Sequence, residues 1–167
     1  MDNYQIPAAV APAGIRLPWE PKASRRILVV DDEPLLRLLY TKLLTELNYQ
    51  VDSAEDGAIA WDALQMTPYD LLITDNLMPK MSGVELLEKI HNARMALPII
   101  MATGTFPEAE FAHSPWLQPE ITLLKPYTPK EFLEAVEEIL HASNGLREEP
   151  VAPPACQIRP LANHLRR

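Results

Sequence analysis

The stretch RILVVDD at residues 26–32 is an apolar run that stops abruptly on charge. Two more runs do the same, LLITD at residues 71–75 and ITLLK at residues 121–125. Buried strands of a parallel sheet are continuous apolar runs, and functional groups gather outside their carboxyl ends. We therefore expect the charged residues that end these runs to meet in one pocket: Asp31, Asp32, Asp75 and Lys125.

Strand and helix patterns alternate five times along the chain, which indicates an α/β fold. Strands are expected at residues 26–31, 50–54, 71–74, 98–102 and 121–124. Helices are expected at residues 34–48, 58–66, 83–93, 108–113 and from 129 onward. Such units with short connections predict a doubly wound, five-stranded parallel sheet with five helices on its two faces. The strand order 2-1-3-4-5 would bring the ends of the first and third strands together at the switch point.

Local patterns predict helix starts and core faces. Ser82 with Glu85, and Thr128 with Glu131, each match a capping box. The helical period predicts a core face for the first and the last helix. These faces comprise Leu36, Leu39, Leu43 and Leu47 in the first helix, and Phe132, Val136, Ile139 and Leu140 in the last. Trp116, which lies between two prolines, is expected to anchor a loop.

Composition is that of an ordinary globular protein, with 47% apolar and 23% charged residues. The net charge of −8 argues against nucleic acid as a direct partner. Cys156 is the only cysteine, so we expect no intramolecular disulfide framework. Neither a secretory signal nor a membrane-length apolar run is present, so we expect a cytoplasmic protein. Residues 1–24 and 143–167 are proline-bearing and aperiodic, which predicts flexible tails around one domain at residues 25–142.

The charged pocket suits phosphoryl transfer. Mg²⁺ prefers hard oxygen ligands and uses one or two carboxylates plus phosphate oxygens. A carboxylate held against such a cation stays ionised and can act as a nucleophile, while Lys125 would neutralise charge on the transferring group. Thr103 ends the fourth expected strand, where its hydroxyl could donate to a phosphoryl oxygen, and Gly104 beside it leaves room for that group.

Four motifs in order resemble the receiver domain of two-component response regulators, the chemotaxis-type stand-alone module with a flavodoxin-like fold. They are VVDDEP at residues 29–34, ITDNLMPKMSG at residues 73–83, ATG at residues 102–104 and LKPY at residues 124–127. The resemblance covers about residues 25–142. It implies that a histidine kinase or phosphotransfer protein phosphorylates Asp75 and that a downstream protein target then binds.

The same resemblance implies a role for each site residue. Asp31 and Asp32 would hold Mg²⁺ together with Asp75 and the backbone carbonyl of Leu77. Thr103 would be the switch hydroxyl, Lys125 would contact the phosphoryl group, and the Lys125–Pro126 bond would be cis. One position departs from the family pattern, because Thr122 stands where an inward-turning aromatic ring is usual. Tyr127 is expected to pack after the proline.

Three functions are weighed. The favoured one is a phosphorylation-controlled switch, a monomer or weak phosphorylation-dependent dimer, that catalyses only its own phosphorylation and dephosphorylation and is not otherwise an enzyme. A phosphorylation-independent adaptor is the main alternative, favoured by Thr122. A phosphohydrolase would need a second acid where Leu77 stands. Three more leucines of the first helix, Leu35, Leu38 and Leu44, favour extra core contact over a kinase-docking face.

Overall fold

The computed structural model describes residues 25–145, with side chains described for residues 25–142. The segments before residue 25 and after residue 145 lie outside the described residues. They contain Cys156 and most of the two predicted tails. The last helix continues to Gly145, so it extends beyond the expected domain end at residue 142.

Five parallel strands form one sheet in the order β2-β1-β3-β4-β5, which confirms the predicted topology. The strands are β1 (Arg26–Val30), β2 (Gln50–Ala54), β3 (Leu71–Thr74), β4 (Ile99–Thr103) and β5 (Ile121–Leu124). The helices are α1 (Pro34–Glu46), α2 (Gly57–Met66), α3 (Gly83–Asn92), α4 (Glu108–His113) and α5 (Pro129–Gly145). A short 3₁₀ helix, η1 (Pro115–Leu117), was not predicted.

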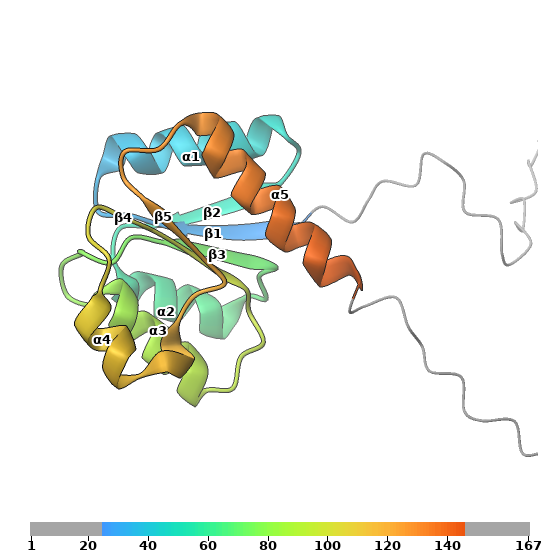
Figure 1. Cartoon of the computed structure of the whole chain (residues 1–167). Helices are drawn as coiled ribbons and strands as arrows, with labels where there is room; N and C mark the ends of the chain where they lie inside the picture. Colours follow the sequence, from blue (N-terminus) through green and yellow to red (C-terminus); the bar gives the residue numbers. More distant parts are fainter. Residues whose placement is uncertain (1–24, 146–167) are drawn as a thin grey trace, which may run out of the picture.

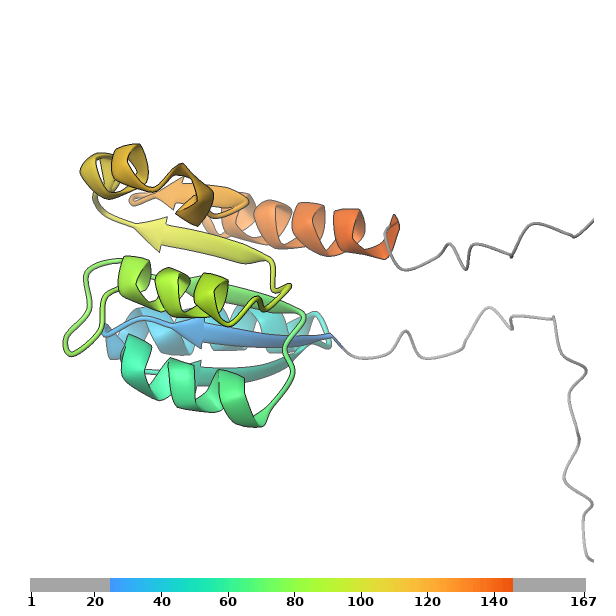
Figure 2. The ribbon, with the colours of Figure 1, turned by 90° about the horizontal axis from the view of Figure 1, so that it is seen from below.

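Helices cover both faces of the sheet. Helices α1 and α5 lie on one face, and α2, α3 and α4 lie on the other (Figure 1). Seen from below, α2 and α3 stand in front of the sheet (Figure 2). All strands run the same way, so their carboxyl ends form a single edge from which the functional loops emerge.

Two apolar cores explain why the strand runs are continuous. Ile27 and Val29 of β1 pack under α1 and α5, whereas Leu28 and Val30 pack under α2 and α3. Successive strand side chains point to opposite faces, so a strand covered on both sides needs apolar residues at every position. Each such side chain stabilises the fold by about 1.5–3 kcal/mol when fully buried.

The predicted core face is right for α5 and partly right for α1, where Leu36 and Leu43 are partly buried against the core. All four predicted residues of α5 are buried, with Phe132 fully inaccessible. The fully buried residues of α1 are Tyr40 and Leu44, which the predicted face did not include, while Leu39 and Leu47 are exposed. Of the three further leucines of α1 for which core contact was expected, Leu44 is buried in the core, whereas Leu35 and Leu38 are exposed.

The predicted loop anchor at Trp116 is wrong as well. Trp116 is 63% exposed, and its neighbour Leu117 in η1 is buried. Both predicted capping boxes are present: the Glu85 carboxylate accepts a hydrogen bond from the Ser82 backbone N–H at 2.7 Å, and Glu131 does the same for Thr128. Within residues 25–145, no helix has both the length and the apolar character needed to cross a membrane.

Candidate functional site

Three carboxylates converge where β1 and β3 end. Asp31 and Asp32 follow β1, and Asp75 follows β3, which is paired with β1 in parallel. One oxygen of each carboxylate lies within 4.8 Å of the other two. Asp31 and Asp75 are buried whereas Asp32 is exposed, so the cluster opens to solvent on one side. This set of hard oxygen donors fits a divalent cation such as Mg²⁺.

Asp31 is held rigidly by its neighbours. Its Oδ1 accepts a hydrogen bond from the Glu33 backbone N–H at 2.9 Å, and its Oδ2 accepts one from the Lys125 ammonium at 2.9 Å. The Arg37 guanidinium on α1 donates to the Asp31 backbone carbonyl at 2.6 Å. The start of α1 is thereby attached to the acidic end of β1.

Asp75 presents two oxygens with different partners. Oδ1 accepts hydrogen bonds from the backbone N–H groups of Asn76 and Leu77, the latter at 3.2 Å. Oδ2 accepts one from the Lys125 ammonium at 2.7 Å. One oxygen is therefore fixed by the loop backbone, while the other faces a side-chain cation that is able to move away. The side chain of Leu77 itself is exposed.

Lys125 bridges the two buried carboxylates. Burial acts to lower the pKa of its ammonium, but the hydrogen bonds to Asp75 and Asp31 outweigh burial and the pKa is raised. Lys125 therefore remains charged at neutral pH. Two buried carboxylates share this one ammonium and the exposed Asp32 carboxylate lies beside them, so the pocket keeps an excess of negative charge that a bound cation would offset.

Thr103 is brought to the same edge but is engaged within its own turn. Its buried hydroxyl donates to the Thr105 backbone carbonyl at 3.2 Å and accepts from the Thr105 N–H at 3.4 Å. Its backbone carbonyl accepts from the Lys125 N–H at 2.9 Å, which places the two strand ends side by side. A Cβ added to Gly104 would meet nothing within 4 Å, which agrees with the room expected there.

The loop between β3 and α3 is fitted closely around Asp75. A Cβ on Gly83 would lie 2.3 Å from the Asp75 carbonyl oxygen, so only glycine lets α3 start against the strand end. Asn76 closes the loop, because its backbone and side-chain oxygens accept from the N–H groups of Gly83 at 3.0 Å and Val84 at 3.1 Å. Sequence reasoning missed Asn76, whose only signal was its position directly after Asp75.

An ion pair between Asp56 and Lys80 joins the same loop to the start of α2. Asp56 caps α2 by accepting from the Ile59 N–H at 2.9 Å, and the Lys80 ammonium donates to it at 2.6 Å. The hydrogen bond from Lys80, followed by that from the helix backbone, lowers the pKa of Asp56. The Gly57 N–H also donates to the Met81 carbonyl at 3.2 Å, so the loop that follows Asp75 is attached to α2.

Two tyrosines lie beside the pocket on the side of α1. Their hydroxyls share a hydrogen bond between Tyr40 of α1 and Tyr127 of the β5–α5 loop. Both rings stack nearly parallel to the fully buried ring of Phe132. Tyr127 therefore packs after the proline as expected, and the Lys125–Pro126 bond is cis as expected. The role of Tyr40 was not predicted, because the period placed it off the core face.

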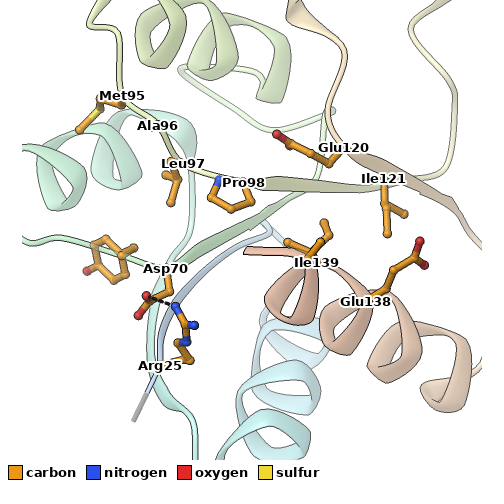
Figure 3. Close-up of a pocket in the computed structure, with 12 residues that line it drawn as sticks. Arg25, Asp70, Met95, Ala96, Leu97, Pro98, Glu120, Ile121, Glu138 and Ile139 are labelled. Carbon is orange, nitrogen blue, oxygen red and sulfur yellow. Dashed lines mark hydrogen bonds and ion pairs between the residues drawn. The ribbon is translucent and has the colours of Figure 1, made fainter. Parts of the chain in front are cut away.

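A different hollow lies at the opposite, amino end of the sheet. It measures about 620 Å³ and is lined by residues that precede the strands, among them Arg25, Asp70, Pro98 and Glu120 (Figure 3). The Arg25 guanidinium pairs with the Asp70 carboxylate at 2.8 Å, and Glu120 accepts from the Ile99 N–H at 2.7 Å. None of the predicted site residues lines this hollow.

Comparison with known proteins agrees with the geometry. The family model described as the response regulator receiver domain matches residues 27–137. A chemotaxis protein CheY homolog of Campylobacter jejuni is 35% identical over 124 residues, which cover 72% of this chain and 95% of that protein. The sensor histidine kinase TmoS of Ectopseudomonas mendocina is 33% identical over 153 residues, which cover 89% of this chain but only 16% of the kinase.

Among solved structures, the response regulator protein TrrA of Thermotoga maritima, in complex with Mg(2+)-BeF, superposes with a TM-score of 0.61. It is 34% identical, and the match covers 69% of this chain and 98% of TrrA. The match therefore covers nearly the whole of the CheY homolog and of TrrA, but only a small part of the much longer kinase TmoS.

Proposed function

Because this chain belongs to the receiver domain family of two-component response regulators, we propose that it is a phosphorylation-controlled switch with Asp75 as the phosphoryl acceptor. The observation that carries the proposal is the pairing at Asp75, whose Oδ1 is fixed by the loop backbone while Oδ2 faces the Lys125 ammonium. The carboxylate is thus oriented for attack, with a cation placed where phosphoryl charge would develop.

The transfer step balances without further reactants. A lone pair of the Asp75 carboxylate forms the new O–P bond, and the N–P bond of a phosphohistidine donor breaks with its electron pair passing to the imidazole nitrogen. A histidine kinase or phosphotransfer protein supplies that donor, in keeping with the family. Lys125, released from Asp31 and Asp75, contacts the transferred group, and Thr103 turns its hydroxyl from Thr105 toward a phosphoryl oxygen.

The acidic cluster is proposed to hold Mg²⁺. The donor set fits, because three carboxylate oxygens lie within 4.8 Å of one another on a side that opens to solvent. Asp31, Asp32 and Asp75 would be ligands together with the backbone carbonyl of Leu77. When bound, the ion offsets the excess negative charge and neutralises phosphoryl oxygens. Mg²⁺ binding is supported by the solved relative TrrA, whose complex holds Mg(2+)-BeF.

The output of the switch is proposed to be protein–protein contact in the cytoplasm, with a downstream protein target. The predicted surface comprises α4, β5 and α5, which flank Thr103 and Lys125. Activity beyond self-phosphorylation and self-dephosphorylation is not proposed, because Leu77 stands where a phosphohydrolase would need its second acid. A phosphorylation-independent adaptor remains the rival function, motivated by Thr122.

Loading with Mg²⁺ and beryllofluoride, a phosphoryl mimic, separates switch from adaptor. Partners are captured on the immobilised full chain with and without beryllofluoride, and Asp75→Asn serves as the control that cannot be loaded. The switch predicts a partner whose capture changes on loading of the wild type alone. Unchanged capture and unchanged amide spectra, despite a filled site, would favour the adaptor.

A further inference from the structure

On the side of α1 and α5, aromatic rings connect the pocket to the helices. Strand β5 has the sequence ITLL and carries no ring, so Thr122 offers no large group that moves between two positions. Tyr127, two residues after Lys125, does carry one, and its hydroxyl is bonded to that of Tyr40. The pair therefore joins the β5–α5 loop to α1 across 87 positions of sequence.

Both hydroxyls lie within the electrostatic field of the pocket. Burial raises the pKa of Tyr40 first of all, and Asp31 and Asp75 add to the increase while Lys125 opposes it. Burial likewise raises the pKa of Tyr127, with the same two carboxylates contributing. The pair consequently keeps both phenolic protons, of which only one lies between the two oxygens. The other is free to be donated elsewhere, so the pair has two hydrogen-bonding arrangements.

Phosphorylation removes the partners that hold Lys125 in place. Its ammonium is bonded to Oδ2 of Asp31 and Oδ2 of Asp75, the residues assigned to the metal and to the phosphoryl group. When they are engaged, Lys125 has to take a new partner. Tyr127 follows Lys125 after a single intervening residue, and its ring lies against Phe132, so a shift of the Lys125 backbone would move the tyrosine pair.

Helix α1 is the element positioned to respond. It is attached to the pocket at two successive turns, by Arg37, which donates to the Asp31 carbonyl, and by Tyr40. On the basis of the proposed function, we propose that the Tyr40–Tyr127 hydroxyl pair couples phosphorylation of Asp75 to α1, so that the phosphorylation-sensitive surface includes α1 beside the start of α5. The two tyrosines are positioning residues, which act through Lys125 and touch no reacting atom.

Amide hydrogen exchange on the full chain, with and without Mg²⁺ and beryllofluoride, tests this coupling. Tyr40→Phe and Tyr127→Phe each keep the ring and remove the hydroxyl. Tyr49→Phe is the matched control, because its ring packs against the same core cluster. In the wild type and in Tyr49→Phe, loading is expected to change exchange of α1 amides by about threefold or more. In the two other variants that change is lost, while exchange at residues 76–82 and 103–106 still responds.

A second readout follows from reciprocity. If the pair couples the site to α1, its removal also shifts the beryllofluoride concentration at half-loading by about two- to fivefold, in the same direction for both variants. A tyrosine with a purely structural role would lower the melting temperature without changing the loading response.

Each outcome decides between the two proposals. Retention of the α1 response in Tyr127→Phe or Tyr40→Phe overturns the coupling, as does its equal loss in Tyr49→Phe. A wild type that responds at residues 76–82 but not in α1 also overturns it, and leaves the proposed switch intact. A wild type that responds nowhere overturns the proposed function itself and the coupling with it.

Discussion

The two ends of the sheet arrange their charged side chains differently. At the amino end, Arg25 pairs with Asp70 and Arg26 with Asp52, each at 2.8 Å. At the carboxyl end, the Asp31 and Asp75 carboxylates share the Lys125 ammonium, and the Asp32 carboxylate lies beside them. At the amino end, each of the two carboxylates has a guanidinium of its own, so neither pair needs a further cation. An excess of negative charge in a largely buried cluster is costly unless a ligand compensates for it, so we propose the carboxyl end as the place where a cation binds.

The largest effect is expected on phosphoryl incorporation, when Asp75 at the carboxyl end is replaced. Asp75→Asn keeps the shape of the side chain but removes the nucleophile, so phosphoryl incorporation from acetyl phosphate is expected to fall by more than about 100-fold. Asp70→Asn, at the opposite end of β3, is the matched control and should incorporate phosphate as the wild type does. Intact-protein mass after incubation with Mg²⁺ measures both. Equal loss in the two variants would contradict the contrast between the ends.

A smaller effect is expected for the metal. Asp31→Asn removes one of the negative charges of the cluster, so Mg²⁺ affinity measured by calorimetry should fall by about 10- to 100-fold. Asp52→Asn removes a charge that Arg26 already matches, and Mg²⁺ affinity should not change. A weaker affinity in Asp52→Asn would show that total charge, and not the cluster, determines binding.

Asp56 and Lys80 also lie at the carboxyl end of the sheet, but they form an ion pair with each other. They therefore separate the effect of position from the effect of unmatched charge. Asp56→Asn should therefore act on stability, lowering the free energy of unfolding by about 1 kcal/mol at pH 7. The folded-state pKa of Asp56 lies below 3.8, so its contribution is present above that pH and is lost as pH falls through the lower folded value. Urea unfolding should show a difference from the wild type that shrinks below about pH 4.

The smallest expected effect concerns the lifetime of the phosphorylated state. Leu77 and Thr105 flank the expected path of the attacking water, and neither carries a charged or amide group to orient it. Self-dephosphorylation should be slow, and Leu77→Asn should accelerate it by about threefold because an amide can position water. The decay of the phosphorylated mass with time measures this. A wild-type half-life of only seconds would contradict it.

Sequence reasoning succeeded where one pattern dominated. The strands β1, β3 and β4 are buried on both faces, so their continuous apolar runs had no competing interpretation. The core face of α5 was equally clear, because charged residues separate its apolar positions. The charged run-ends correctly predicted that Asp31, Asp32, Asp75 and Lys125 lie together, since parallel strands bring their carboxyl ends to one edge.

The failures have physical causes as well. Helix α1 is apolar on most of its surface, so the period alone could not select Tyr40 and Leu44 over Leu39 and Leu47. The partner of Tyr40 lies 87 residues away, and no local pattern predicts such a contact. The orientation of the Thr103 hydroxyl toward Thr105 likewise depends on the folded turn.

The central claim is that excess negative charge at the carboxyl end creates a Mg²⁺-dependent phosphoryl acceptor at Asp75. The most direct test is to map the phosphorylated residue in the wild-type chain. The protein is incubated with acetyl phosphate, with Mg²⁺ or with a chelator, and the acyl phosphate is then reduced with borohydride and located by peptide mass spectrometry. We expect one modified residue, Asp75, and modification only when Mg²⁺ is present. Modification of a carboxylate elsewhere, or equal modification of Asp75 without Mg²⁺, would contradict it.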